Sequence, residues 1–267
     1  MWTAHGIRII PGPSALWFDA AGKRLPPPLF PGFDTLATLQ HLASTGHGYS
    51  WFILNQRIIA KEFALSGSEQ NPDLTGKSVR KTLSRVLPGA ITPVGIFQQK
   101  GADFVTAADL PELVRRMNTL TGDGLLDAAR LAHEIEARDR EIANSFTKDA
   151  QIAAIRNART YLGDKLVRVT KPHCILDPKA GPLIAVRLCV LTRKTLGGLQ
   201  TDLCARVLQA NGQPLGNVFA AGEVAGFGGG GMHGYRSLEG TFLGGCLFSG
   251  RTAGRAAAEA VDSARRR

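Results

Sequence analysis

The sequence has few of the residues that build disulfide frameworks and metal centres. Its 267 residues include four cysteines and six histidines. No two cysteines form a CxxC pair, and the histidines are dispersed without ligand spacing. No HExxH motif, GxSxG nucleophile elbow or complete GxxxxGK[ST] motif is present either. These absences argue against zinc chemistry, serine hydrolysis and P-loop nucleotide hydrolysis.

Long apolar runs are absent as well. No run approaches the roughly 18 residues that a transmembrane helix needs. The first residues, MWTAHGIRIIPGPS, carry neither a long apolar core nor a cleavage-site pattern. We therefore expect no signal peptide, no membrane partner and a cytoplasmic protein. In that compartment the cysteines are expected to be buried, reduced thiols; they are Cys174, Cys189, Cys204 and Cys246.

Positive charge prevails, but it is dispersed along the chain. Lys and Arg number 32 against 22 Asp and Glu, which gives a formal net charge of +10. The cations stand in short separate groups without interleaved aromatic residues, such as Arg115–Arg116 and Arg265–Arg267. Solvated surface charge is therefore the first interpretation, an anionic ligand the second, and nucleic-acid binding a distant third. A hydrophobic content of 44% and a charged content of 20% are typical of a globular protein.

The spacing of apolar and turn residues predicts a mixed set of helices and strands. Asp34 is expected to cap a helix over 35–43. The run 49–59 is strand-like and expected to be central, whereas 66–101 is polar and turn-rich, without a regular element. The other expected elements are a strand at 17–19 with a turn at 20–23, helices at 110–117, 125–144 and 241–264, and β-type runs at 167–170, 183–191 and 218–221. The apolar stripe of the helix over 125–144 is expected to be Leu126, Ala129, Ala132, Ile135 and Ile142.

Glycine, by contrast, is abundant: the chain has 31, and many fall in its last quarter. The most informative stretch, Val218–Gly254, begins as an apolar strand, reaches a single carboxylate at Glu223 and runs into consecutive glycines. Backbone this poor in side chains lets a large planar ligand lie against the main chain, and glycine tolerates the positive φ of such loops. The small-residue helix that follows, near Thr241, offers free N–H groups and a positive dipole end to an anionic or electron-rich ligand atom.

This pattern resembles the C-terminal flavin-binding segment of the fumarate reductase/succinate dehydrogenase flavoprotein superfamily. It is most similar to the FAD-binding dehydrogenase branch that includes the 3-ketosteroid Δ1-dehydrogenases. The stretch 195–214 resembles the family's GG turn and hairpin, and 19–24, 104–117 and 137–141 resemble its cap domain. The resemblance implies an α/β fold: part of a flavin-binding, Rossmann-like domain plus an α+β cap domain. We expect the cap or substrate domain at 1–165, with strands at its start that can return to the flavin domain, and the C-terminal part of the FAD-binding domain at 166–267.

One part of the family pattern has no counterpart. These enzymes start with a strand–GxGxxG–helix unit that holds the ADP half of FAD. Nothing near the N-terminus has that form, and Gly226–Gly231 matches GxGxxG only as any run of glycines does. The chain is therefore expected to correspond to the C-terminal half of a longer flavoprotein, as a fragment, a truncated product or one piece of a split enzyme.

The resemblance assigns FAD as cofactor and implies which residues would hold it: Gly222, Glu223, Gly240, Thr241 and Phe242. The Glu223 carboxylate would accept hydrogen bonds from ribityl or ribose hydroxyls; alternatively it pairs with N–H groups of its own loop. The helix start at Gly240–Phe242 would face the isoalloxazine ring and stabilise negative charge on it. The alternative there is a plain helix start.

The resemblance also implies catalytic roles for Tyr235, Arg236 and His233. Tyr235 stands where the ketosteroid dehydrogenases polarise a substrate carbonyl, and Arg236 stands where fumarate and succinate enzymes bind a substrate carboxylate. His233 would orient a substrate oxygen. Loop structure is the alternative for all three, for example an ion pair between Arg236 and Glu239. The residues Thr192–Thr195 and Pro28–Phe33 depart from the reductase pattern, which argues against a dicarboxylate reductase.

Together these features favour an FAD-dependent oxidoreductase that acts on CH–CH bonds adjacent to a carbonyl. The expected substrate is a ketone or enone, steroid-like in kind, and the expected partners are an N-terminal flavoprotein half or a second copy of the chain, with no nucleic acid. The alternative is a non-catalytic fragment or binding module that cannot retain FAD alone.

Overall fold

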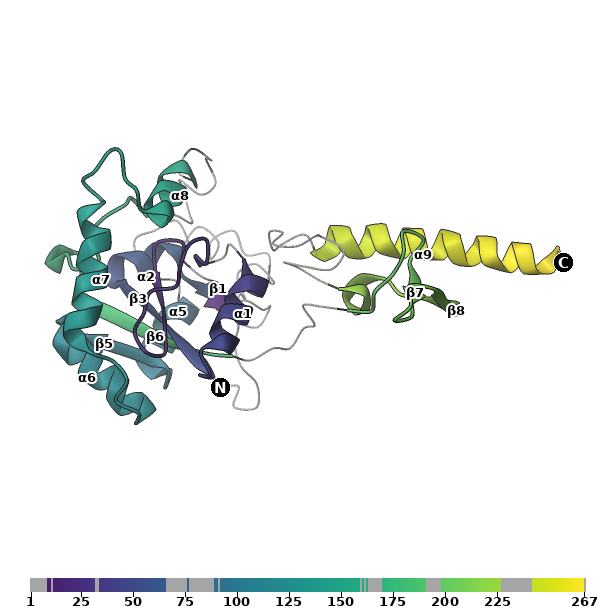
Figure 1. The fold of residues 1–267 in the computed structure, drawn as a ribbon. Coiled ribbons are helices and arrows are strands. Elements are labelled where there is room, and N and C mark those ends of the chain that lie inside the picture. Colours follow the sequence, from purple (N-terminus) through teal and green to yellow (C-terminus); the bar gives the residue numbers. More distant parts are fainter. Residues whose placement is uncertain are drawn as a thin grey trace. The chain divides into compact units, whose positions relative to one another are not determined.

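The computed structural model describes residues 9–10, 12–31, 34–65, 76, 89–90, 92–158, 160, 162, 170–190, 198–226 and 242–266. The chain divides into two compact units (Figure 1). Unit 1 comprises Met1–Gly32 and Leu42–Val190, and unit 2 comprises Phe33–His41 and Leu191–Arg267. The fold is mixed α/β, as expected, and its sheets are small.

Unit 1 is built on a four-stranded antiparallel sheet in the order β2-β3-β6-β5. Its strands are β2 (Leu16–Asp19), β3 (Tyr49–Asn55), β5 (Phe104–Ala107) and β6 (Leu183–Cys189). Every residue of β3 after Tyr49 is buried, because the strand lies between β2 and β6. The predictions of a central strand from residue 49 and of a strand from 183 are confirmed.

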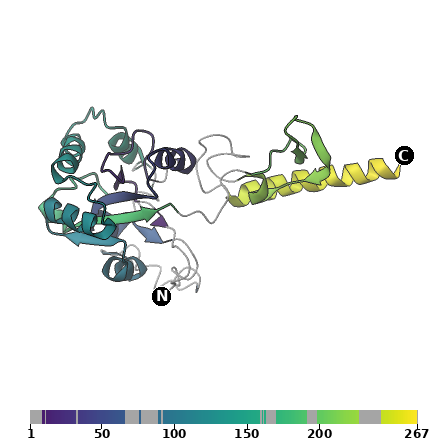
Figure 2. The same cartoon turned by 60° about the horizontal axis from the view of Figure 1, so that its bottom comes forward.

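Helices lie on both sides of this sheet (Figure 2). They are α2 (Gln56–Glu62), α5 (Thr92–Lys100), α6 (Leu110–Thr121), α7 (Ala128–Arg140) and α8 (Ala150–Ala158). A two-residue antiparallel pair, β1 (Ile9–Ile10) with β4 (Ala64–Leu65), and a 3-10 turn, η2 (Pro178–Ala180), complete unit 1. One continuous apolar core joins the sheet to α2, α5, α6 and α7, with Phe18, Trp51, Ile53, Leu113 and Ile184 among its fully buried members, whereas Ile152 and Ile155 of α8 form a separate small cluster.

Three expectations for unit 1 are wrong at particular residues. Residues 56–62 form α2 instead of extending the strand, because the Asn55 side chain accepts a hydrogen bond from the Ile58 amide (3.2 Å) and so caps a helix. Part of the stretch 66–101, expected to lack regular structure, forms α5. In α7 the buried face is Leu131, Ile135 and Arg138, while Ala129 is exposed. The alanine residues alone do not predict which face of this helix is buried.

The helix expected over 110–117 is confirmed as α6. The Asp109 carboxylate accepts a hydrogen bond from the Glu112 amide (2.9 Å), and Gly122 ends the helix at φ +74°. The four residues expected on its apolar face, Leu110, Leu113, Val114 and Met117, are all buried. The Asp34 cap of α1 (Thr35–Ser44) is also confirmed, since its carboxylate accepts from the Ala37 amide (2.9 Å).

A buried carboxylate ties distant segments of unit 1 together. Glu62 ends α2 and accepts hydrogen bonds from the Ser14 amide (2.8 Å), the Ser14 hydroxyl (2.7 Å) and the Thr170 amide (2.6 Å). Its side chain is enclosed, and burial raises the pKa of the Glu62 carboxyl to about 7, although these three donors oppose the shift. Glu62 therefore links the Ser14 turn, α2 and the chain before β6.

Unit 2 is smaller and has little core of its own among the described residues. It contains the antiparallel hairpin β7 (Arg206–Leu208) and β8 (Pro214–Phe219), the 3-10 turn η3 (Gly222–Ala225) and the long helix α9 (Phe242–Arg265). The final helix and the strand near Val218 are thus confirmed, although the strand begins earlier than expected. In its described part, the buried apolar side chains from Leu191 onward are Ala205, Val207 and Ala220.

Two sequence expectations concern membranes and thiols. None of the helices in the described part of the chain is long and apolar enough to cross a membrane. All four cysteines are free, as expected, but the expectation that they are buried is wrong: Cys189 and Cys204 are exposed, and Cys174 and Cys246 are partly exposed. Cys189 is the last residue of β6, and Cys204 lies in a turn.

Substitution of Glu62 by glutamine is expected to flatten the pH dependence of stability between pH 5 and pH 8. Because the folded-state pKa is raised, native Glu62 holds a proton that the unfolded chain releases near pH 4.5. That stabilisation is complete below the unfolded pKa and is lost as the pH rises through the folded pKa. Between pH 5 and pH 8 the parent should therefore lose roughly 2–3 kcal/mol of its free energy of unfolding, measured by urea denaturation, and Glu62→Gln should not show this loss.

Glu112→Gln is the matched control. Glu112 is partly exposed and pairs with Arg115 and Arg116, whose hydrogen bonds lower its pKa to about 2, so it does not titrate between pH 5 and pH 8. This variant should keep the parent's pH dependence. If Glu62→Gln also keeps it, Glu62 is not the titrating group.

Candidate functional site

The site is built where β8 ends. The Ala220 amide donates to the Ala205 carbonyl (3.0 Å), which continues the hairpin one residue beyond the strand. Ala221 is still extended, and the chain then turns sharply at Gly222, which has φ +66°. A residue with a side chain rarely adopts that conformation, so glycine is required for the turn into η3.

A serine on α9 holds this turn in place. The Gly222 amide donates to the Ser249 hydroxyl (2.9 Å), and that hydroxyl donates to the Gly245 carbonyl (2.8 Å). Ser249 is buried, and a Cβ on Gly222 would lie 3.4 Å from the Cys246 sulfur. The turn therefore packs against the helix between Gly245 and Ser249. The sequence analysis missed Ser249; its one signal is a hydroxyl in the first two turns of α9, among small and apolar residues from Phe242 to Gly250.

A second close approach fixes η3 from the other side. The Leu199 amide donates to the Val224 carbonyl (2.8 Å). A Cβ on Gly198 would lie 2.2 Å from the Gly226 nitrogen and 2.7 Å from the Val224 oxygen, closer than real atoms approach. Glycine is therefore needed at 198 for the backbone at this residue to lie on η3, which gives a packing reason for a glycine that the family pattern singled out.

Glu223 is the one carboxylate of this turn. It stands in the first turn of η3, and its side chain is half-buried. Its carboxylate forms no hydrogen bond or ion pair with any other residue that the structure describes. A fixed carboxylate of this kind can accept hydrogen bonds from the hydroxyl groups of a ligand. Its donors can come from water, from a ligand or from residues outside the described part of the chain.

The predicted site residues divide into two groups. Gly222 and Glu223 are brought beside α9, and Phe242 is the first residue of that helix, so the main-chain N–H groups of its first turn lack helical partners. The other predicted residues, His233, Tyr235, Arg236, Gly240 and Thr241, lie outside the described residues. Within the described part, the Glu223 carboxylate at the end of the strand can accept hydrogen bonds, and the N-terminal end of α9 can stabilise negative charge. An extended, hydroxyl-bearing cofactor such as FAD requires both features.

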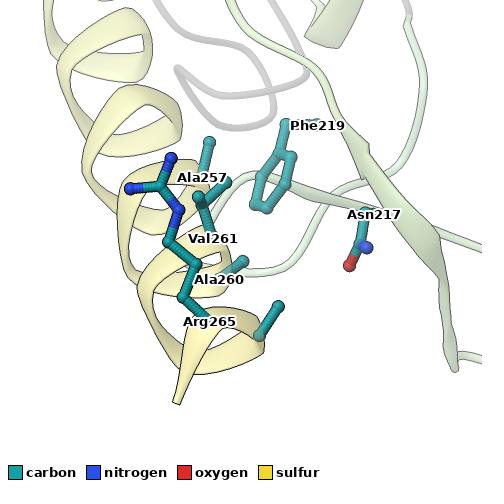
Figure 3. Close-up of a pocket in the computed structure, with 7 residues that line it drawn as sticks. Asn217, Phe219, Ala257, Ala260, Val261 and Arg265 are labelled. Atoms are coloured by element: carbon teal, nitrogen blue, oxygen red, sulfur yellow. The ribbon is translucent and has the colours of Figure 1, made fainter. Parts of the chain in front are cut away.

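A cavity lies elsewhere on unit 2. It has a volume of about 420 Å³ and is lined by Asn217 and Phe219 of β8 and by Ala257, Ala260, Val261 and Arg265 of α9 (Figure 3). Ala257 comes eight residues after Ser249, the residue that contacts the turn at Gly222, which places it roughly 12 Å farther along the helix. This cavity is therefore separate from the Glu223 turn. In the described part of the chain, no cluster of His, Cys, Asp or Glu could hold a metal ion.

Comparison with known proteins gives one family match and several similar proteins. Residues 1–243 match the family described as FAD binding domain. The chain is 63% identical over 262 residues to a KsdD-like steroid dehydrogenase of Mycobacterium tuberculosis, covering 98% of this chain and 46% of that protein. It is 66% identical over 243 residues to a KsdD-like steroid dehydrogenase of Mycolicibacterium smegmatis, covering 91% and 44%. The chain thus spans about half the length of the curated relatives it matches.

Solved structures show more distant similarity. The 3-ketosteroid Δ4-(5α)-dehydrogenase of Rhodococcus jostii, in complex with 4-androstene-3,17-dione, is 20% identical with a TM-score of 0.48, covering 92% of this chain and 39% of that one. The 3-ketosteroid Δ1-dehydrogenase of Sterolibacterium denitrificans, in complex with 1,4-androstadiene-3,17-dione, is 17% identical with a TM-score of 0.48, covering 93% and 39%.

Ser249→Ala is expected to release the turn at Gly222. With its acceptor removed, the Gly222 amide should exchange with solvent roughly 5–30-fold faster, as measured by hydrogen exchange and NMR, because one buried hydrogen bond is lost. Thr252→Ala is the control on the same helix, since the Thr252 hydroxyl donates to the Phe248 carbonyl (3.0 Å) and not to the turn. Equal exchange of the Gly222 amide in both variants would contradict the role given to Ser249.

Proposed function

Because the chain belongs to the FAD binding domain family, we propose that it is an FAD-dependent oxidoreductase that acts on a CH–CH bond adjacent to a carbonyl. The proposed substrate is a ketone or enone of steroid-like shape. The main support is the identity of 63–66% with KsdD-like steroid dehydrogenases over nearly the whole chain. The Glu223 turn beside the start of α9 is the structural feature that fits this function.

In this proposal the cofactor is held from the strand end and from the helix start. Glu223 accepts hydrogen bonds from ribityl or ribose hydroxyls. The positive φ at position 222 requires glycine, so the turn carries no side chain there that would crowd these hydroxyls. Gly240, Thr241 and Phe242 present the N-terminal end of α9, whose dipole stabilises negative charge. FAD, when bound, supplies the hydride acceptor or donor for the reaction.

The substrate is positioned by the residues between the glycine run and α9. Tyr235 donates a hydrogen bond to the substrate carbonyl and so favours loss of a proton from the neighbouring carbon. Arg236 or His233 helps to orient the substrate oxygen. We further propose a cap domain at 1–165, the C-terminal part of a Rossmann-like FAD-binding domain at 166–267, and a cytoplasmic location.

A second candidate is a non-catalytic module that keeps this half of the site but cannot retain FAD. Two observations favour it: the chain spans about half the length of its relatives, and unit 2 leaves large apolar side chains exposed, among them Leu243 and Leu247. FAD titration of the purified chain separates the two candidates. Saturable binding that raises the melting temperature supports the enzyme, and absence of any binding supports the module.

Glu223→Ala is expected to weaken FAD binding about 10–100-fold, because hydrogen bonds to a charged acceptor are lost. The measurement is the dissociation constant from quenching of flavin fluorescence. Glu259→Ala is the control, since Glu259 is an exposed carboxylate on α9 more than a dozen residues beyond the turn. An unchanged dissociation constant for Glu223→Ala would refute the role of this carboxylate.

Tyr235→Phe is expected to lower kcat about 100–1000-fold with little change in FAD binding, as for the loss of one oxyanion donor. Turnover of 4-androstene-3,17-dione with an artificial electron acceptor provides the assay. Tyr49→Phe is the control, because the Tyr49 hydroxyl donates to Asp123 in unit 1 and has no role in the proposed chemistry. Full turnover by Tyr235→Phe would reject this assignment.

A further inference from the structure

One buried amide at the end of β3 has a fixed orientation. The Asn55 side-chain nitrogen donates to the carbonyls of Cys174 (3.3 Å) and Ile175 (3.2 Å). Its Oδ1 accepts from the Ile58 amide (3.2 Å), and this bond caps α2. A main-chain N–H can only donate and a carbonyl oxygen can only accept. These three partners therefore fix which end of the Asn55 side chain is the oxygen.

The ring of His173 lies between two acceptor oxygens. Its Nε2 is 3.1 Å from Asn55 Oδ1, and its Nδ1 is 3.0 Å from the Lys171 carbonyl oxygen. Because neither oxygen carries a proton, both ring nitrogens must be protonated for both hydrogen bonds to exist. A neutral imidazole has one N–H, so it can keep only one of the two bonds.

The surroundings of the ring oppose the protonated form. Burial lowers the pKa of His173 most, and the nearby charges of Arg57 in α2 and Arg138 in α7 lower it further. The hydrogen bond from Nδ1 and the Asp177 carboxylate raise the pKa of the ring without reversing the shift. Asp139 on α7 also contacts this segment, but its charge is paired with Arg138 (2.8 Å). The doubly protonated ring is therefore stable only in acid, below the ordinary histidine pKa of about 6.5.

The backbone of this segment has separate anchors, so the ring can move alone. The Arg138 Nη1 donates to the His173 carbonyl (2.7 Å), and the Asp139 carboxylate accepts from the Ile175 amide (3.0 Å). Neither contact involves the imidazole. His173 is half-buried, whereas Asn55 beside it is fully buried. Movement of the ring would thus open Asn55 and the cap of α2 to water.

We propose that His173 is a pH-operated closure over the Asn55 cap of α2. In the protonated state the ring bridges the Lys171 carbonyl and Asn55 Oδ1 and shields the Asn55 side chain. In the neutral state it keeps the local bond to Lys171, two residues away, and releases Asn55, because two lone pairs would otherwise face each other. The closure lies within unit 1 and needs no flavin, so its test is independent of the proposed function.

NMR of the ¹⁵N-labelled full chain between pH 4.5 and pH 8 tests the proposal directly. Both ring nitrogens of His173 should carry a proton at the acid end, and only Nδ1 should carry one at pH 8. Over the same range the exchange rate of the Ile58 amide, corrected for the intrinsic effect of pH, should rise about 3–10-fold, because its hydrogen bond to Asn55 becomes open to water. A ring with one proton at pH 4.5, a proton kept on Nε2 at pH 8, or an Ile58 exchange rate that does not follow the ring would overturn the proposal.

His173→Gln and His133→Gln are the matched pair of variants. Glutamine does not titrate in this range, so His173→Gln should abolish the pH step in the exchange rate of the Ile58 amide. His133 is an exposed histidine of α7, so His133→Gln should keep the full step. Loss of the step in both variants, or in neither, would contradict the role given to His173.

Arg57→Gln tests the charge that acts on the ring from α2. Without this cation the protonated ring is less disfavoured, so the midpoint of the His173 titration should rise by roughly 0.3–0.6 on the pH scale. Arg115→Gln is the control, since Arg115 is an exposed arginine of α6 that pairs with Glu112. A midpoint that stays the same or falls in Arg57→Gln would contradict the placement of the ring beside this charge.

Glu62→Gln separates the ring from the other group that titrates in this range. Glu62 lies at the far end of α2 and has a pKa raised to about 7. Because the closure depends on His173 and Asn55, the step at the Ile58 amide should persist in Glu62→Gln. A step that disappears in this variant would assign it to the carboxyl group and overturn the proposal.

Discussion

One hydrogen bond, from the Gly222 amide to the Ser249 hydroxyl, fixes the end of β8 against the last helix. Because Gly222 turns with a positive φ, the residue after it, Glu223, is presented at a defined point beside that helix. Gly198 holds the same turn from the other side through a backbone approach that no side chain would allow. The chemistry assigned to unit 2 depends on these close approaches, since a looser turn would not keep the carboxylate in one place.

The two units differ in how far each can stabilise itself. Unit 1 has a continuous core around β3 and satisfies its buried carboxylate Glu62 with three donors. Unit 2 combines a two-stranded hairpin with a long helix, and it leaves Leu243, Leu247 and Phe248 exposed. A two-stranded hairpin of this size is marginal alone, and few apolar side chains are buried in the described part of unit 2.

The sequence predicted best where a local rule and the tertiary structure agree. Asp34 and Asp109 cap helices as expected, and α6 buries the four apolar residues that its spacing singled out. The prediction failed where a single polar contact decides the structure, as when Asn55 converts the end of a strand pattern into α2. Ser249 was missed because its partner, Gly222, is 27 residues away along the chain. The roles of Tyr235, Arg236 and His233 remain predictions, because they come from the family pattern alone.

Hydrogen exchange with and without FAD, resolved by peptide, tests most directly whether the Glu223 turn holds the cofactor. Added FAD should slow exchange in the peptides that contain Gly222–Gly226 and the first turn of α9. Peptides from the C-terminal half of α9 and from β3 should exchange at the same rate with and without FAD. Protection confined to other segments, or no protection at saturating FAD, would contradict the assignment of this turn as the flavin site.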